Sequence, residues 1–225
     1  MTNTRTRFES GLQQLRDRIL DMGLRADSML ADAIRAAVEQ DADLATQVVR
    51  SDREVDRADI DIETDCMLLI ALEAPVAKDM RLIGSSMKII SDLERIADYA
   101  VDIAKIGRRL AREMRYQPLV DLAKLGGRAR AMLQEALKAF VNGDVALAAR
   151  VVEMDNEVDA LFHEQRDYLL ELLDRETGHG YAGGNLLLAV KYLERIGDHA
   201  TNIAERIAYI ETGNAAGTAE PRTGE

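Results

Sequence analysis

Residues 29–56 read MLADAIRAAVEQDADLATQVVRSDREVD, and the chain repeats this segment at residues 132–159 as MLQEALKAFVNGDVALAARVVEMDNEVD. Aligned without a gap, 14 of the 28 positions are identical, and the copies lie 103 residues apart. Two unrelated helices share an apolar rhythm easily, but they do not share charged residues at the same phase. The repeat therefore indicates a duplicated unit.

A second match supports the duplication and gives the length of the unit. Residues 92–104 read DLERIADYAVDIA and residues 192–204 read YLERIGDHATNIA, with 8 of 13 positions identical at an offset of 100. The three-residue difference between the two offsets places a length change in the turn between the matched segments. We therefore expect two units of about 100 residues each.

Each unit is predicted to contain three helices that pack up and down. In the first unit these run over about 8–39, 41–72 and 75–114, with Asp41 as an N-cap. In the second unit Pro118 and Gly143-Asp144 open the first two helices, and a turn at 178–184 precedes the last, which ends near Glu211. The predicted fold is all-α: two tandem, pseudo-symmetric three-helix bundles at 1–115 and 116–211, with a disordered tail at 212–225.

Composition limits the classes of function. The net charge of −11 disfavours direct binding of nucleic acid. Cys66 is the single cysteine, which excludes an intramolecular disulfide and fits the cytoplasm. The longest apolar run, residues 66–72, is too short to span a bilayer, and residues 1–8 contain no apolar signal region. No nucleophile triad, glycine-rich phosphate loop or zinc-binding spacing is present.

Carboxylates lie along the edge of the core face in the third helix of each unit. At about 100° per residue, Glu94 and Asp98 are neighbours one turn apart, as are Glu194 and Asp198. The core face itself is formed by Leu93, Ile96, Ala97, Ala100, Ile103 and Ala104, and by Leu193, Ile196, Gly197, Ala200, Ile203 and Ala204. Like charges at this spacing destabilise a bare helix by roughly 0.2–0.5 kcal/mol, so the pairs call for a reason.

The second helix of each unit carries a matching acidic stripe bordered by apolar residues. In the first unit the stripe consists of Asp52, Asp56, Asp59 and Glu63. The second unit keeps Asp155 and Asp159, but Phe162 and Arg166 replace the last two acids. Crowded, half-buried carboxylates either rise in pKa or are neutralised by a cation. Oxygen ligands favour hard metal ions, so the pattern predicts one metal site in each bundle.

Other interpretations of these residues stay open. Asp59, Glu63 and Asp102 are changed or absent in the second unit and are as consistent with solvated acids as with ligands. His163 and His199 are interpreted as surface residues. A metal-free helical scaffold is one alternative. A carboxylate-bridged di-metal oxidase is disfavoured, because its site needs an ExxH motif on two helices and the only ExxH here runs from Glu176 to His179, in a glycine-rich joint.

These motifs resemble the PhoU family. The resemblance rests on the doubled (D/E)xxxD pattern, the LERI-x-D helix in both halves and PVAKDMR at 75–81, and it covers about residues 8–211. It implies bound metal ions, with iron, manganese, magnesium or zinc as candidates. The implied ligands are Asp52, Asp56, Glu94 and Asp98 in the first bundle, and Asp155, Asp159, Glu194 and Asp198 in the second.

The resemblance also implies a role. Members of the family are non-enzymatic, cytoplasmic negative regulators of the phosphate-starvation response. They link the Pst phosphate ABC transporter, through its ATPase subunit, to a PhoR-type sensor histidine kinase, and they restrain phosphate uptake. We also expect a homodimer and no direct contact with nucleic acid. The second unit lacks the counterparts of Asp59 and Glu63, so equal occupancy of the two metal sites is not expected.

Overall fold

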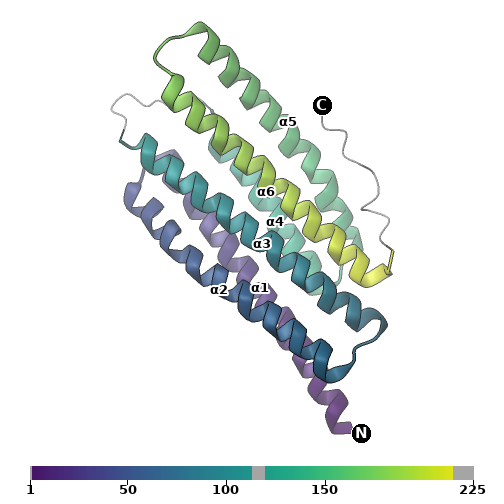
Figure 1. The fold of residues 1–225 in the computed structure, drawn as a ribbon. Helices are drawn as coiled ribbons and strands as arrows, with labels where there is room; N and C mark the ends of the chain where they lie inside the picture. Colours follow the sequence, from purple (N-terminus) through teal and green to yellow (C-terminus); the bar gives the residue numbers. More distant parts are fainter. Residues whose placement is uncertain (1, 113–119, 215–225) are drawn as a thin grey trace.

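Six long helices make up the part of the chain that the computed structural model describes, residues 2–112 and 120–214, of which only the backbone is described for 2–5 (Figure 1). They lie side by side as two three-helix bundles. Their bounds are α1 Thr2–Glu39, α2 Ala42–Glu73, α3 Ala77–Leu110, α4 Leu122–Asn142, α5 Val145–Arg175 and α6 Gly180–Thr212. The predicted all-α fold with two tandem bundles is confirmed.

Aspartates begin three of the helices. Asp41, as predicted, accepts hydrogen bonds from the backbone N–H groups of Asp43 and Leu44 at the start of α2. Asp121 caps α4 and Asp144 caps α5 in the same way. Each carboxylate satisfies backbone donors that have no partner inside the helix, which fixes where the helix begins.

Several helix bounds differ from the prediction. The first helix begins at Thr2 and not near residue 8, and α4 begins at Leu122 and not at Pro118. The turn predicted at 178–184 is shorter, because α6 begins at Gly180. Gly183 lies inside α6, where a Cβ would lie 2.7 Å from Leu173 Cδ2, so this glycine serves close packing and not a turn. The third helix ends at Leu110, before the predicted end at Met114. Pro118, the predicted boundary at 115/116 and most of the predicted tail fall outside the described residues.

The core consists mainly of Leu, Ile, Val, Ala and Met side chains, with Phe140 and Phe162 among the few others. Every residue of the predicted core faces of α3 and α6 is buried. Cys66 is also buried and belongs to this core. The buried residues of both bundles form one continuous cluster, because α3 packs on α6 and α1 packs on α4.

The contact between α1 and α4 repeats the symmetry of the duplication. A Cβ at Gly23 would lie 2.4 Å from Leu137 Cδ2, and a Cβ at Gly126 would lie 2.6 Å from Ile34 Cδ1. Gly23 and Gly126 are 103 residues apart, as are Ile34 and Leu137, so the two contacts are equivalent. The two bundles thus pack about a pseudo-twofold axis.

None of the helices in the described part of the chain has an apolar stretch of the length that a membrane span needs.

Candidate functional site

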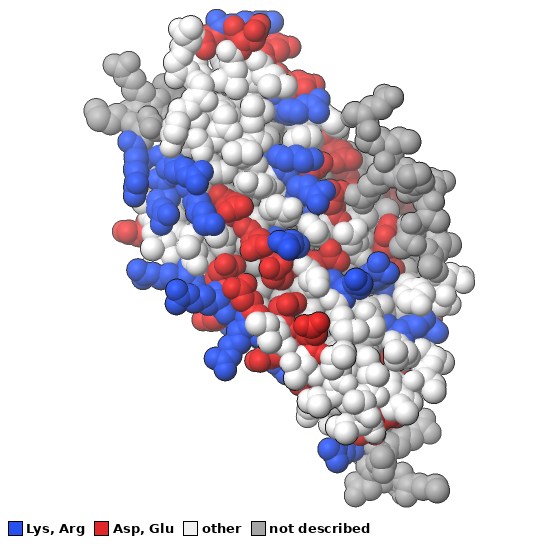
Figure 2. Space-filling model, in the orientation of Figure 1, with Lys and Arg blue, Asp and Glu red and all other residues white. Residues whose placement is uncertain are grey.

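The first candidate site lies between α2 and α3, where acidic side chains form a band on the surface (Figure 2). Val48, Val55 and Ile62 are buried and hold α2 on the core. Asp52 and Asp59 follow this stripe at its edge and are partly buried, whereas Asp56 is exposed. We use the name acidic groove for the side chains that follow the line along which α2 packs on α3. Its members are Asp52, Asp56 and Asp59 of α2 with Glu94, Asp98 and Asp102 of α3.

Asp52 shows that carboxylates of the two helices face one another. Burial raises the pKa of Asp52, and repulsion from Asp56 and Asp98 raises it further. Lys105 of α3 lowers this pKa but does not cancel the rise. The predicted pairing of a DxxxD motif on α2 with an ExxxD motif on α3 therefore has an electrostatic signature in the structure.

Glu94 and Asp59 extend the same relationship along the groove. Burial raises the pKa of Glu94, followed by repulsion from Asp98, while Arg95 lowers it and Asp59 and Asp56 raise it. The pKa of Asp59 is raised by burial, then by Glu63 and Asp56. Asp59, which the sequence left undecided between solvated acid and ligand, thus lies within electrostatic reach of a predicted ligand on the other helix.

Two carboxylate oxygens in the groove are buried without a hydrogen-bond partner, Asp52 Oδ1 and Asp59 Oδ1. A buried carboxylate oxygen without a donor is costly unless a cation approaches it. The donor set consists of oxygen atoms only, which suits a hard divalent or trivalent cation. The residues of the groove therefore fit the metal that the resemblance implies.

Side-chain positions in the groove are set by local cations. Arg95 Nη1 donates to Asp98 Oδ2 at 3.0 Å, and Lys105 Nζ donates to Asp102 Oδ1 at 3.0 Å. Among the described residues, no three Asp, Glu, His or Cys side chains converge on one point in the manner of metal ligands. Binding a shared ion would therefore require rotation of these side chains away from their present partners.

In the second cluster, between α5 and α6, Glu194 Oε2 is also buried without a hydrogen-bond partner. A Cβ at Gly197 would lie 3.2 Å from Asp155 Oδ1, so α5 delivers this carboxylate directly onto α6. Glu194 accepts from Lys191 Nζ at 2.7 Å, and Asp198 accepts from Arg195 Nη1 at 3.2 Å. The side chains of Glu194 and Asp198 are only 13% and 18% exposed. Asp159 is partly buried on the same helix as Asp155.

The PhoU domain model matches residues 19–107 and again residues 122–207, once for each bundle. The chain belongs to the PhoU family. It is 35% identical over 211 residues to the phosphate-specific transport system accessory protein PhoU homolog of Clostridium acetobutylicum, covering 93% of this chain and 96% of that protein. It is 34% identical to the homolog of Deinococcus radiodurans, covering 93% and 99% respectively.

Crystal structures of PhoU proteins show the same fold. The structure of PhoU from Pseudomonas aeruginosa superposes with a TM-score of 0.89 at 33% identity, covering 92% of this chain and 100% of that one. The phosphate transport system regulatory protein PhoU from Streptococcus pneumoniae superposes with a TM-score of 0.85 at 28% identity, covering 92% and 98%. PhoU homologues are accessory and regulatory proteins, so the prediction that the chain is not an enzyme is confirmed.

Sequence reasoning missed a polar contact between α3 and α6 that joins the two bundles. His199 was interpreted as a surface residue, and this is wrong: its side chain is 12% exposed, and its Nδ1 lies 2.7 Å from Asp92 Oδ1 of α3. Asn202 donates to the same carboxylate oxygen at 3.2 Å. The equivalent positions in the repeat hold Tyr99 and Tyr192, whose rings stack at 5.4 Å. The sequence does contain a signal of this contact, because both of its positions differ between the repeats: Asp92 corresponds to Tyr192, and His199 corresponds to Tyr99.

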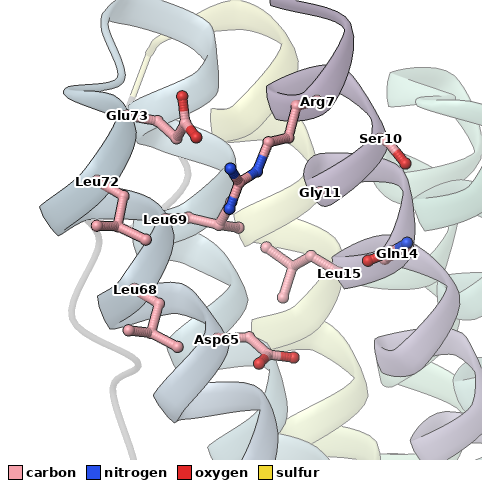
Figure 3. Close-up of a pocket in the computed structure, with 10 residues that line it drawn as sticks. All are labelled: Arg7, Ser10, Gly11, Gln14, Leu15, Asp65, Leu68, Leu69, Leu72 and Glu73. Carbon is pink, nitrogen blue, oxygen red and sulfur yellow. The ribbon is translucent and has the colours of Figure 1, made fainter. Parts of the chain in front are cut away.

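A separate groove of about 410 Å³ opens between the N-terminal part of α1 and the end of α2 (Figure 3). Leu68 and Leu72 line it along α2, and Arg7 extends from α1 towards α2. None of the acids predicted as metal ligands lines this groove. This groove between α1 and α2 is therefore distinct from the acidic groove.

Proposed function

We propose that this chain is a negative regulator of the phosphate-starvation response that also restrains phosphate uptake. It works in the cytoplasm, where it links the Pst phosphate transporter, through the ATPase subunit, to a PhoR-type sensor kinase. Support comes from membership of the PhoU family and from the names of relatives that match nearly end to end, which describe accessory and regulatory proteins of phosphate transport.

We also propose that regulation depends on metal bound in the acidic groove by Asp52, Asp56, Glu94 and Asp98. The observation that carries this is the buried, unpartnered Asp52 Oδ1 facing the acids of α3. A multivalent cation would neutralise the carboxylates and tie α2 to α3. The surface between these helices would then have one fixed shape and a reduced negative charge, as a docking surface for protein partners needs.

Elemental analysis of the untreated purified protein tests the metal. We expect bound iron, manganese, magnesium or zinc in the wild type, and loss of most of that metal in a variant with Asp52→Asn and Asp98→Asn. The control is Glu54→Gln, because Glu54 is an exposed acid of α2 that pairs with Arg25 of α1 and not with α3. A wild type without metal would favour the metal-free scaffold.

Complementation tests the regulatory role. In cells that lack their own copy of this protein, a phosphatase reporter of the phosphate-starvation response should be active even in ample phosphate. The wild type should silence it, and Asp52→Asn/Asp98→Asn should silence it less, while Glu54→Gln should act as the wild type does. Co-purification with the transporter ATPase and with the kinase measures the link directly. A reporter that ignores the protein would contradict the proposal.

A further inference from the structure

We propose that Lys191 is a built-in cation that closes the second cluster to metal, so that this chain binds metal in its first bundle only. The inference rests on the metal binding proposed for the acidic groove. It departs from the expectation of one metal site in each bundle, and it assigns the difference to particular side chains.

The position of Lys191 is fixed from two sides. Its Nζ donates to Glu194 Oε1 at 2.7 Å along α6. The same nitrogen lies 5.0 Å from the ring centre of Phe162 on α5, within the range of a cation–π contact. The ammonium therefore sits between the two helices that carry the implied metal ligands. The Glu194 side chain is only 13% exposed, whereas that of Lys191 is 47% exposed, so water screens the pair in part.

Around the Lys191 ammonium, the two repeats share the carboxylate, Glu194 or Glu94, but differ in the other residues. Phe162 takes the place of Asp59, and Lys191 takes the place of Ser91. The first bundle therefore offers an additional acid and a neutral hydroxyl where the second holds an aromatic ring and a cation. Arg166, in the place of Glu63, adds a further cation 5.5 Å from the same ring.

A second basic contact is shared by both bundles and cannot explain a difference between them. Arg195 pairs with Asp198 at 3.2 Å, and Arg95 pairs with Asp98 at 3.0 Å. The ion pair of Glu94, by contrast, is with Arg95, whose Nε lies 3.5 Å from Glu94 Oε2 and whose side chain is 59% exposed. Lys191 is thus the contact that distinguishes the implied ligand Glu194 from its counterpart Glu94.

A metal ion entering the second cluster would meet two obstacles. Lys191 holds Glu194 Oε1, which leaves only the buried Oε2, without a hydrogen-bond partner, for the ion, and the ion would then stand beside the ammonium that contacts Phe162. In the first bundle the positions of Phe162 and Arg166 hold Asp59 and Glu63. These two carboxylates repel each other and attract a cation. The same metal should therefore occupy the first bundle and leave the second to its lysine.

Manganese binding to the full chain, followed by calorimetric titration and by elemental analysis after gel filtration, tests this proposal. Asp98→Asn should abolish most of the bound manganese, while Asp198→Asn should leave it unchanged. Lys191→Ser, alone and with Phe162→Asp, should add binding at the second cluster and raise the manganese content about twofold. Lys191→Arg keeps a cation in place and should bind as the wild type does.

The outcomes separate this proposal from the one on which it rests. If Asp198→Asn loses as much manganese as Asp98→Asn, the second cluster binds metal despite Lys191, and the inference is overturned while the acidic groove keeps its role. If Lys191→Ser and the double variant both fold, by circular dichroism, and neither gains manganese, the lysine does not close the site. If neither the wild type nor any variant binds manganese, iron or zinc, both proposals fall.

Discussion

Asp27 of α1 and Arg130 of α4 occupy equivalent positions in the two repeats, and they bind each other across the pseudo-twofold axis. Arg130 donates through Nε at 2.7 Å and through Nη2 at 2.9 Å, a two-pronged contact with a carboxylate that is only 12% exposed. In a symmetric pair of identical units, the same residue would face itself at this position. The duplicated chain can place opposite charges there, which a homodimer of one unit cannot.

Breaking this pair should weaken the docking of the two bundles. We expect Arg130→Met to lower the free energy of unfolding by about 1–3 kcal/mol, because Asp27 would keep only its contacts with Gln134, while the partial exposure of Arg130 limits the loss. Urea denaturation measures the change. The exchanged variant Asp27→Arg/Arg130→Asp should recover part of the stability that Asp27→Arg alone removes. Additive losses in the double variant would contradict a direct interaction.

Acid pH should stabilise the metal-free protein relative to neutral pH through the acidic groove. The pKa values of Asp52, Asp59 and Glu94 are raised in the folded state, first of all by burial. A raised carboxyl pKa contributes stability below the unfolded value, near 4, and this contribution is lost as pH rises through the folded value. Melting temperatures of chelator-treated protein between pH 4 and pH 7 measure the trend.

Asparagine substitution separates this effect from other acids in the chain. In metal-free protein at pH 7, Asp52→Asn should raise the melting temperature, because it removes a desolvated charge that Asp56 and Asp98 repel. In the presence of manganese the order should reverse, since the wild type gains stability from the bound ion and the variant does not. A melting temperature that is lower for the variant under both conditions would point to a structural role for Asp52.

Cys66 should be almost inert in the native protein. It is buried on α2, and burial together with the nearby Asp65 and Glu63 raises the pKa of the thiol to about 12. Because the thiolate is the reactive form, an aromatic disulfide reagent at pH 8 should label the native chain far more slowly than the unfolded chain in guanidinium. Fast labelling of the native protein would mean that α2 opens readily, which the buried Val55 and Ile62 argue against.

The internal structure of each bundle could be predicted from the sequence, whereas the contact between the bundles could not. The helical period identified the core faces of α3 and α6, and Asp41 marked the start of α2, because these features depend on residues close together in the chain. The pairs Asp27–Arg130 and Asp92–His199 join residues about a hundred positions apart, and a repeat gives no information on how its two copies pack.

The candidate site, too, could be predicted only in part. The acids of α2 and α3 were found because their spacing puts carboxylates on one helix edge, and the structure brings them to a shared interface. Lys191 was missed because it lies outside the segments whose identity revealed the repeat, and its contact with Phe162 crosses from α6 to α5. Residues that are identical in both repeats identify the framework that the bundles share. Residues that differ between the repeats identify where the two sites differ.

The two glycines at the crossing of α1 and α4 allow a final prediction. A Cβ at Gly126 would lie 2.6 Å from Ile34 Cδ1 and 2.8 Å from Ile34 Cγ1, a distance that requires Ile34 to move. Gly126→Val should therefore separate the helices and destabilise the fold by about 1–3 kcal/mol, as overpacking of a core does. Gly127→Val provides the control, because Gly127 is exposed and has nothing within 4 Å of its added Cβ. Ile34→Ala should relieve part of the loss in the Gly126→Val background but destabilise the wild type. Thermal melts of the wild type, the two single variants and the Gly126→Val/Ile34→Ala double variant would show this.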